Sequence, residues 1–222
     1  QYVKAREAKY GYTGTETKIT SGGTEYTHTN FMDSHLVKNS EWGAVAYLTQ
    51  SKYGRNGNEI DINNNSLFRT GQGGDLASTT GNIYGIYDMS GGTWERAAGY
   101  NKLSSSYLTS STQGLNMTQE AKDADGNYTS TKYVTAYENE TNSSVNNAYN
   151  VCKIGDAIKE VRTGNDTSKA WFSDKSFLVN LRSPFFERGG IYDSGADAGV
   201  FCSNNSYGNS NSHYSFRTVL CP

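Results

Sequence analysis

The Gly81–Glu95 stretch constrains the fold of this chain most, because apolar and aromatic residues alternate in it with glycines. Its sequence is Gly-Asn-Ile-Tyr-Gly-Ile-Tyr-Asp-Met-Ser-Gly-Gly-Thr-Trp-Glu. Glycine adopts positive φ angles at little cost, so the pair Gly91-Gly92 predicts a tight turn that brings Trp94 into a core. Arg188-Gly189-Gly190 predicts a close approach between two chain segments, because the two glycines have no Cβ atoms.

The clearest helix in the sequence lies between residues 39 and 54. Asn39 or Ser40 can cap its N-terminus, and Gly54 is expected to stop it after Lys52. Its inward-facing residues are spaced by three and four positions: Trp42, Val45 and Ala46. This spacing predicts one amphipathic helix that packs on the core.

Short strands are expected near both ends of the chain. Residues 1–30 are polar, and the alternating threonines around Gly22-Gly23 predict strands there. Between the two ends, Gly57–Gly81 has the composition of an ordered coil. From Pro184 onward the expected inward residues are apolar: Phe185, Phe186, Ile191, Val200, Phe201, Phe216, Val219 and Leu220. These patterns predict an α+β fold that is rich in coil, with a small antiparallel sheet closed by the last segment.

The length of 222 residues is enough to bury a full core, so we expect a single domain over residues 1–222. Residues 101–180 are rich in Ser, Thr, Asn and Tyr and predict an insertion, with a disordered insertion as the alternative. Within it, Asp156–Val161 predicts a short helix with Ile158 and Val161 turned inward. Four apolar residues are expected to tether the insertion to the main body: Val151, Ile154, Trp171 and Phe172.

The overall composition excludes some classes of partner. The chain has 20 basic and 22 acidic side chains and no run of Lys or Arg, so we do not expect nucleic acid as a partner. No apolar run approaches the ~20 residues of a membrane span. The 17 Tyr and 24 Gly, set against 2 Pro, are typical of binding loops.

The three cysteines do not have the spacing of a zinc site. Buried thiols are the expected state of Cys152, Cys202 and Cys221, and a bridge between Cys202 and Cys221 is the alternative. The sequence starts with Gln1 rather than Met, which is compatible with the removal of an export signal or an N-terminal anchor.

Four pieces of the sequence, taken in order, resemble the formylglycine-generating-enzyme branch of the C-type lectin fold. The first is Leu36, Glu41 and Trp42 followed by Ala44, Val45 and Ala46, which is similar to a helix motif of that family without its proline. The other three are the Gly81–Glu95 stretch, Arg188-Gly189-Gly190 and Ser215-Phe216-Arg217. The resemblance implies a C-type lectin-like fold over most of the chain.

The resemblance also implies a candidate activity, which the residues do not support. Formylglycine-generating enzymes oxidise a substrate cysteine with copper held by two cysteines, whose places fall near Ser194 and Gly199. The related sulfoxide synthases need a histidine cluster for iron, and this chain has only His28, His35 and His213. We therefore expect no enzyme. The alternative is an enzyme of the formylglycine-generating type, or a catalytically dead relative with a structural role.

The sequence predicts no cofactor, and a structural calcium ion is the alternative. The calcium site of the family uses an Asn and a Glu around its Trp. This chain keeps Glu95 but has Gly92 at the place of the Asn, which removes an oxygen ligand. Asp88 and Glu95 are therefore expected to support the turn.

The C-terminal residues have the composition of a recognition loop. Residues 203–214 contain Ser, Asn, Tyr, Gly and His and no aliphatic side chain. A solvated loop without function is the alternative. The arrangement resembles the variable proteins of diversity-generating retroelements, which mutate adenines in a C-terminal cassette so that Asn codons give way to Tyr, Ser, Asp, His or Phe codons.

This resemblance implies that residues 184–222 form a variable ligand-binding segment. The residues to which it assigns ligand contacts belong largely to the set that adenine mutation reaches: Tyr192, Asp193, Ser194, Asp197, Phe201, Ser203, Asn204, Asn205, Tyr207, Asn209, Asn211, His213 and Tyr214. Phe201 fits a place in the core equally well. The expected partner is a protein or glycan on another cell or virus surface, and the expected location is extracellular, on a bacterial cell surface or a phage particle.

Overall fold

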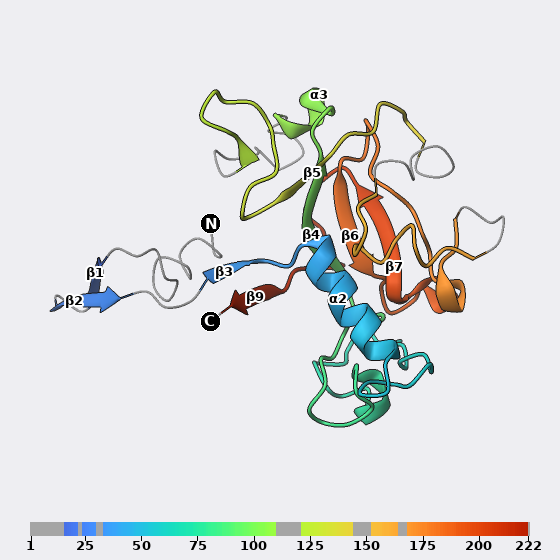
Figure 1. Ribbon diagram of the computed structural model, residues 1–222. Coiled ribbons are helices and arrows are strands. Elements are labelled where there is room, and N and C mark those ends of the chain that lie inside the picture. Colours follow the sequence, from blue (N-terminus) through green and yellow to red (C-terminus); the bar gives the residue numbers. More distant parts are fainter. Residues whose placement is uncertain are drawn as a thin grey trace. The chain divides into compact units, whose positions relative to one another are not determined.

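The computed structural model describes residues 16–21, 24–29, 33–109, 121–143, 152–163 and 168–221 (Figure 1). Contacts between residues divide the chain into two compact units. The first unit contains residues 1–37 and 217–222, and the second contains residues 38–216. The expectations of one domain and of an insertion at 101–180 stay predictions.

Two antiparallel strand pairs form the described part of the first unit. Strand β1 (Glu16–Ser21) pairs with β2 (Thr24–Thr29), and β3 (Asp33–Leu36) pairs with β9 (Thr218–Cys221). The backbone N–H of Val37 donates to the carbonyl oxygen of Arg217 at 3.1 Å and extends the second pair. The strand prediction for residues 1–30 is confirmed at residues 16–21 and 24–29, and the rest of that range lies outside the described residues.

Helix α2 (Asn39–Gln50) opens the second unit and confirms the predicted helix. Its N-cap is Lys38, not Asn39 or Ser40, because the Glu41 carboxylate accepts a 2.8 Å hydrogen bond from the Lys38 backbone N–H. Trp42 is fully buried, and its indole N–H donates to the carbonyl oxygen of Val200 at 2.7 Å. Helix α2 is thereby fixed to the sheet.

A five-stranded sheet forms the centre of the second unit, and its strands are β4 (Trp94–Asn101), β5 (Thr135–Tyr137), β6 (Phe185–Gly189), β7 (Gly199–Ser206) and β8 (Tyr214–Ser215). Its order is β5-β4-β6-β7, and β8 also pairs with β4. The β4–β6 and β6–β7 pairs are antiparallel, as expected, whereas β5 and β8 lie parallel to β4. The expected small antiparallel sheet is therefore only partly correct, because the central sheet is mixed and the last strand, β9, pairs with β3 instead.

The remaining described elements are short: η1 (Asp75–Ala77), α3 (Ser105–Leu108), η5 (Trp171–Ser173) and η6 (Gly195–Asp197). Long coil segments connect them to the sheet (Figure 1). The described residues thus form a mixed α and β structure, rich in coil, as the sequence predicts for the α+β class.

The glycine motifs behave largely as predicted. Gly91, Gly92, Gly189 and Gly190 all have φ between 71° and 84°. A Cβ on Gly190 would lie 2.6 Å from the Cβ of Ala198, so close passage at this motif is confirmed. Trp94, the first residue of β4, is only partly buried, so its predicted burial is only partly correct.

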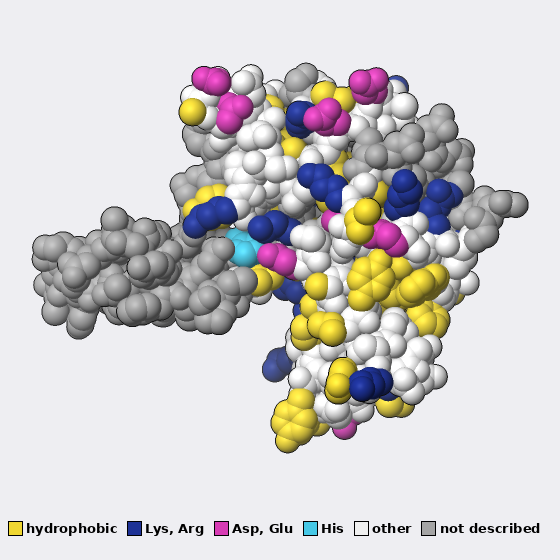
Figure 2. Space-filling view, viewed as in Figure 1, with side chains coloured by type: hydrophobic (Ala, Val, Ile, Leu, Met, Phe, Trp, Pro, Cys, Tyr) yellow, Lys and Arg dark blue, Asp and Glu magenta, His cyan; other side chains and the backbone are white. Residues whose placement is uncertain are grey.

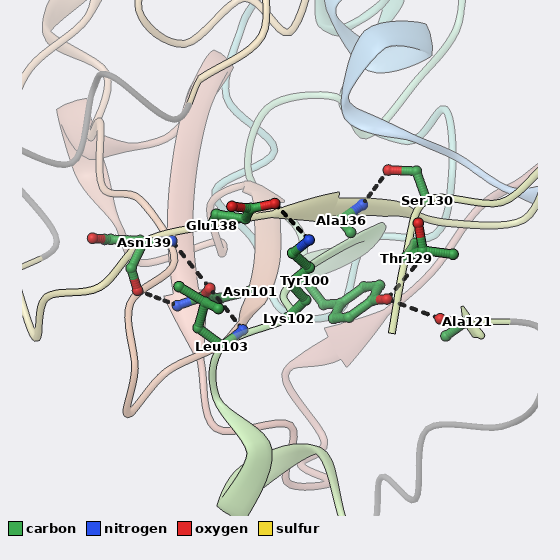
Figure 3. A network of polar contacts seen from close by, with 10 residues as sticks. All are labelled: Tyr100, Asn101, Lys102, Leu103, Ala121, Thr129, Ser130, Ala136, Glu138 and Asn139. Atoms are coloured by element: carbon green, nitrogen blue, oxygen red, sulfur yellow. Dashed lines mark hydrogen bonds and ion pairs between the residues drawn. The ribbon is translucent and has the colours of Figure 1, made fainter. Parts of the chain in front are cut away.

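Residues from the 101–180 range share a core with the sheet. One buried cluster contains residues from both: Ala97, Tyr137, Ile158, Leu178, Val179 and Phe186. Figure 3 shows the polar contacts of the same attachment. The Tyr100 hydroxyl lies 3.0 Å from the Ala121 carbonyl oxygen, and the Asn101 amide donates to the Asn139 carbonyl oxygen at 2.8 Å. Described residues of this range are therefore integral to the second unit.

The helix expected at Asp156–Val161 is wrong, because the segment consists of turns. Ala157 has a φ of 51°, which no α-helix accommodates. The Asp156 carboxylate accepts hydrogen bonds from the Tyr137 hydroxyl at 2.8 Å and the Lys153 backbone N–H at 3.2 Å. Ile158 and Val161 are nevertheless fully buried, as expected.

One of the four expected tethers, Ile154, differs in the structure. Ile154 is 96% exposed and tethers nothing, because it stands on the outer side of its turn, while Val151 lies outside the described residues. Phe172 packs on Phe201 with ring centroids 6.3 Å apart, and Trp171 packs on the same ring at 5.1 Å. These two aromatic contacts agree with the expectation.

The inward residues of the C-terminal strands are mostly confirmed. Phe185, Phe186, Val200 and Phe201 are buried. Phe216 is 51% exposed, because it lies beyond Ser215, the last residue that pairs with β4, and its predicted inward position is wrong. Ile191 and Val219 are partly buried, and the side chain of Leu220 lies outside the description.

Candidate recognition surface

The C-terminal segment, residues 192–214, is attached to the sheet at both ends. At its start, the Tyr192 backbone N–H donates to the Gly92 carbonyl oxygen at 3.0 Å. At its end, the Trp94 backbone N–H donates to the His213 carbonyl oxygen at 2.9 Å, and β8 pairs with β4. The turn at Gly91-Gly92 and the first residue of β4 therefore fix the two ends beside each other.

Arg96 on β4 holds the last part of this segment, residues 207–214, which we call the arm. Its guanidinium donates to the Asn209 carbonyl oxygen at 2.9 Å and lies 4.2 Å from the ring centroid of Tyr214. The same group forms an ion pair with Glu187 at 3.2 Å, and only 2% of the Glu187 side chain is exposed. One side chain thus links β4, β6 and the arm.

The carboxylate of Glu187 is further supported from β7. The Asn204 side-chain amide donates to its Oε2 at 3.0 Å. Burial raises the pKa of the Glu187 carboxyl, while Arg96 opposes this shift. Burial lowers the pKa of Arg96, and Glu187 opposes that shift in turn. The two groups stabilise each other's charge beneath the arm.

The residues to which the sequence assigned ligand contacts fall into three groups by exposure. Five are exposed: Asp193, Tyr207, Asn209, Asn211 and His213. Six are partly buried: Tyr192, Ser194, Asp197, Asn204, Asn205 and Tyr214. Two are fully buried: Phe201 and Ser203. The exposed group is concentrated in the arm.

Phe201 and Ser203 cannot contact a ligand in this structure, and we correct their assignment. Phe201 lies in an aromatic cluster, with its ring centroid 6.2 Å from that of Tyr47 and 5.1 Å from that of Trp171. The Ser203 hydroxyl donates to the Phe177 carbonyl oxygen at 3.0 Å. Both residues point toward the inner side of β7, which is the alternative that strand alternation left open.

Among the partly buried residues, several have structural partners. The Ser194 hydroxyl accepts a hydrogen bond from the Ile191 backbone N–H at 3.0 Å, and Asp197 forms an ion pair with Lys169. The Asn205 amide donates to the Leu178 carbonyl oxygen at 2.6 Å. Tyr192 contacts His213 edge to face, with ring centroids 6.0 Å apart. Tyr192 thus supports the exposed His213 through this ring contact and stays partly accessible itself.

Sequence reasoning missed residues outside the C-terminal segment that border the arm. Tyr107 on α3 packs against Tyr207 with centroids 6.1 Å apart, and the Lys175 ammonium lies 5.9 Å from the ring centroid of Trp94, whose backbone N–H donates to the arm at His213. Strand alternation in β4 could have marked Arg96, since it follows the buried Glu95. No local pattern marks Lys175 or Tyr107.

The two described thiols of the second unit differ in burial. Cys202 is free and fully buried, as expected, whereas Cys152 is free but only partly buried, and the side chain of Cys221 lies outside the description. Burial raises the pKa of the Cys152 thiol to about 12 and that of Cys202 well above its ordinary value. A thiol with a raised pKa is a poor nucleophile and a poor metal ligand.

Two further features complete the chemistry of the described residues. Asp88 has a φ of 60°, and its carboxylate accepts a 3.0 Å hydrogen bond from the Asn63 amide, so its expected role in the turn is confirmed. No three His, Cys, Asp or Glu side chains within the described ranges are grouped so that they could hold a metal ion. The helices in the described part of the chain are all too short or too polar to cross a membrane.

No protein-family model matches this chain, and no curated protein matches it either. The function is therefore inferred from the way β4 and β6 hold the arm.

Proposed function

We propose that this chain is a non-catalytic binding protein whose arm recognises a ligand or receptor. One observation carries the proposal: the backbone of the arm is bonded to Arg96 and Trp94 of β4, while Tyr207, Asn209, Asn211 and His213 remain exposed. A surface held in this way loses little conformational freedom on binding, which favours affinity. Tyr, Asn, Ser and His offer contact area and adaptable hydrogen bonds to varied targets.

The resemblance to variable proteins of diversity-generating retroelements, on a C-type lectin fold of the formylglycine-generating-enzyme type, fits this arrangement. Exchange of exposed side chains alters recognition without altering the core, since surface substitutions usually change stability by about 0.5 kcal/mol or less. Asp193, near the start of the C-terminal segment, is also exposed and adds a fifth candidate contact residue to the four of the arm. The target is a protein or glycan on a cell or virus surface, and the chain acts outside the cell or on a phage particle.

A copper oxidase function has less support. Ser194 and Gly199, at the places of the two copper cysteines, lack thiols, and Cys202 is buried with a raised pKa. Because its thiol is fully buried, Cys202 does not substitute for the missing pair. We therefore favour recognition over catalysis.

Sequencing of this gene and its neighbouring DNA in natural populations tests the proposal. We expect a reverse transcriptase gene and a near-copy of the final coding segment nearby. Codon differences should concentrate at Asp193, Tyr207, Asn209, Asn211 and His213, and should spare the buried Phe201 and Ser203. Variation spread evenly over buried and exposed positions would contradict the retroelement assignment.

A displayed library tests the binding role without knowledge of the natural target. The five exposed positions are varied among Asn, Ser, Tyr and Asp, and a matched library varies Phe201, Ser203, Asn204, Asn205 and Ser206 of β7. We expect most clones of the first library, and few of the second, to resist protease. Protease-resistant clones of the first library should then yield binders to intact bacterial cells. Equal loss of resistance in both libraries would contradict the proposal.

A further inference from the structure

A second surface of the molecule, far from the arm in sequence, exposes many apolar side chains. We call residues 48–86 the apolar lobe. It includes the last turn of α2 and the coil that follows, which Figure 1 shows at the C-terminal end of that helix. Its large exposed apolar side chains are Leu48, Tyr53, Leu67, Phe68, Leu76, Ile83, Tyr84 and Ile86. Tyr84 is 87% exposed and Leu67 is 84% exposed.

The backbone of the apolar lobe is held by internal hydrogen bonds. The Thr79 backbone N–H donates to the Ile86 carbonyl oxygen at 3.0 Å, and the Asp61 backbone N–H donates to the Leu76 carbonyl oxygen at 3.0 Å. Ser78 also pairs with Tyr87 in an isolated bridge. The turns that carry Leu76 and Ile86 are thus fixed side by side, with their apolar side chains directed outward.

The exposed apolar side chains of the lobe together offer enough area for an interface. Taking about 150–200 Å² for each side chain when fully exposed, the eight side chains present on the order of 800 Å² in total. Figure 2 shows apolar side chains on this lobe, at the lower end of the view, with polar surface between them. A standard interface buries roughly 800 Å² on each partner, so a contact that covers most of these side chains reaches that size.

The charges of the lobe and its borders favour a second copy as the partner. Basic and acidic side chains are interspersed there: Lys52, Arg55, Arg69, Glu59, Asp61, Asp75 and Asp88. A surface that carries both signs can place opposite charges across a twofold axis against an identical surface. A partner of one dominant charge would meet like charges in the same area. We propose that the apolar lobe forms the interface between two copies of this chain.

Sedimentation velocity of the purified chain tests this proposal. From about 1 to about 100 μM, the wild type should shift from monomer to dimer, or remain a dimer throughout. Leu67→Glu and Tyr84→Glu should each weaken the dimer by at least about 100-fold, because each dimer carries the charge twice in the apolar contact. Ile154→Glu is the matched control, since Ile154 is equally exposed but lies outside the lobe.

Thermal unfolding shows that each variant is folded before its mass is compared. Leu67→Ser and Tyr84→Ser serve where a glutamate variant does not fold, and they should weaken the dimer in the same direction. A wild type that stays monomeric at ~100 μM overturns the proposal. So does a dimer that the lobe variants leave intact or that Ile154→Glu weakens as much. The exposed residues of the arm are unchanged in all these variants, so the proposed recognition function is tested separately.

Discussion

Strand β7 and the arm are neighbours in sequence and share the same residue types, yet their side chains occupy opposite environments. In β7, Ser203 is fully buried and Asn205 donates to a buried carbonyl oxygen. In the arm, Asn209 and Asn211 are exposed. The Asn side chain therefore stabilises the fold in β7, whereas in the arm it is exposed to solvent.

The backbone partners decide this difference. Strand β7 pairs with β6 along one edge, and its Ser203 also exchanges hydrogen bonds with residues 175 and 177 on the other side. The arm contacts the sheet through only a few groups, chiefly β8, the carbonyl oxygen of His213 and that of Asn209. Composition alone describes both regions as binding loops, while pairing separates a supporting strand from a displayed surface.

The strongest test of this comparison removes the group that joins the two regions. Arg96→Met should destabilise the fold by about 3–5 kcal/mol, because Glu187 keeps a buried carboxylate without its cationic partner. The Asn209 carbonyl oxygen also loses its donor. Urea unfolding measures the change in free energy.

A double variant separates the two effects of Arg96. Arg96→Met with Glu187→Leu should recover much of the lost stability, since no buried charge then remains unpaired. Amide exchange in residues 208–213 should stay faster than in the wild type, because the arm still lacks its donor. Wild-type exchange rates in the double variant would show that Arg96 does not hold the arm.

The next effect concerns pH and the buried side of β7. Asp174 is fully buried, its Oδ2 accepts a hydrogen bond from the Phe201 backbone N–H at 2.9 Å, and its Oδ1 has no hydrogen-bond partner within the described residues. Burial, with the charge of Glu59, raises the pKa of this carboxyl to about 8. The unfolded chain ionises it near 3.9. Between these pH values the folded protein holds one proton more, so its stability falls as the pH rises.

Asp174→Asn removes this titration. We expect the melting temperature of the wild type to fall by several degrees from pH 5 to pH 8.5, and that of the variant to fall less. At pH 5 the two proteins should be similar, because the wild-type carboxyl is then protonated. Glu187 and Asp156 titrate in both proteins, so the difference between the two curves isolates Asp174. Parallel curves would contradict the assignment.

The smallest effect compares one amide from each region. Asn205→Ala should destabilise the fold by about 1–2 kcal/mol, because the buried Leu178 carbonyl oxygen loses its donor. Asn209→Ala should change the stability by about 0.5 kcal/mol or less, because only its backbone carbonyl is used. Chemical unfolding of both variants measures the ratio. Equal values would remove the distinction between β7 and the arm.

Local signals predicted the parts of the fold that local chemistry determines. Helix α2 follows from the spacing of Trp42, Val45 and Ala46, and the positive φ angles at Gly91 and Gly190 follow from the lack of a Cβ. The exposed part of the candidate surface was also predictable, since the arm has no aliphatic residue that could be buried.

Tertiary contacts determine what the sequence did not show. Ala157 takes a positive φ where Tyr137 and Lys153 hold Asp156, and this overrides the apparent helix signal. Strands β5 and β8 contain only three and two residues, too few for any periodicity, so their parallel pairing was not predictable. The link from Arg96 to the arm joins residues more than 100 positions apart and has no local signature.

The pairing of β3 with β9 brings together the two points where the chain enters and leaves residues 38–216. Val37 and Arg217, which flank this range, are joined by a backbone hydrogen bond of 3.1 Å. A module whose two ends lie side by side can be inserted into a surface loop of another protein without changing the distance between the ends of that loop. Residues 38–216 thus begin and end at neighbouring points, which is the geometry that insertion into another protein requires.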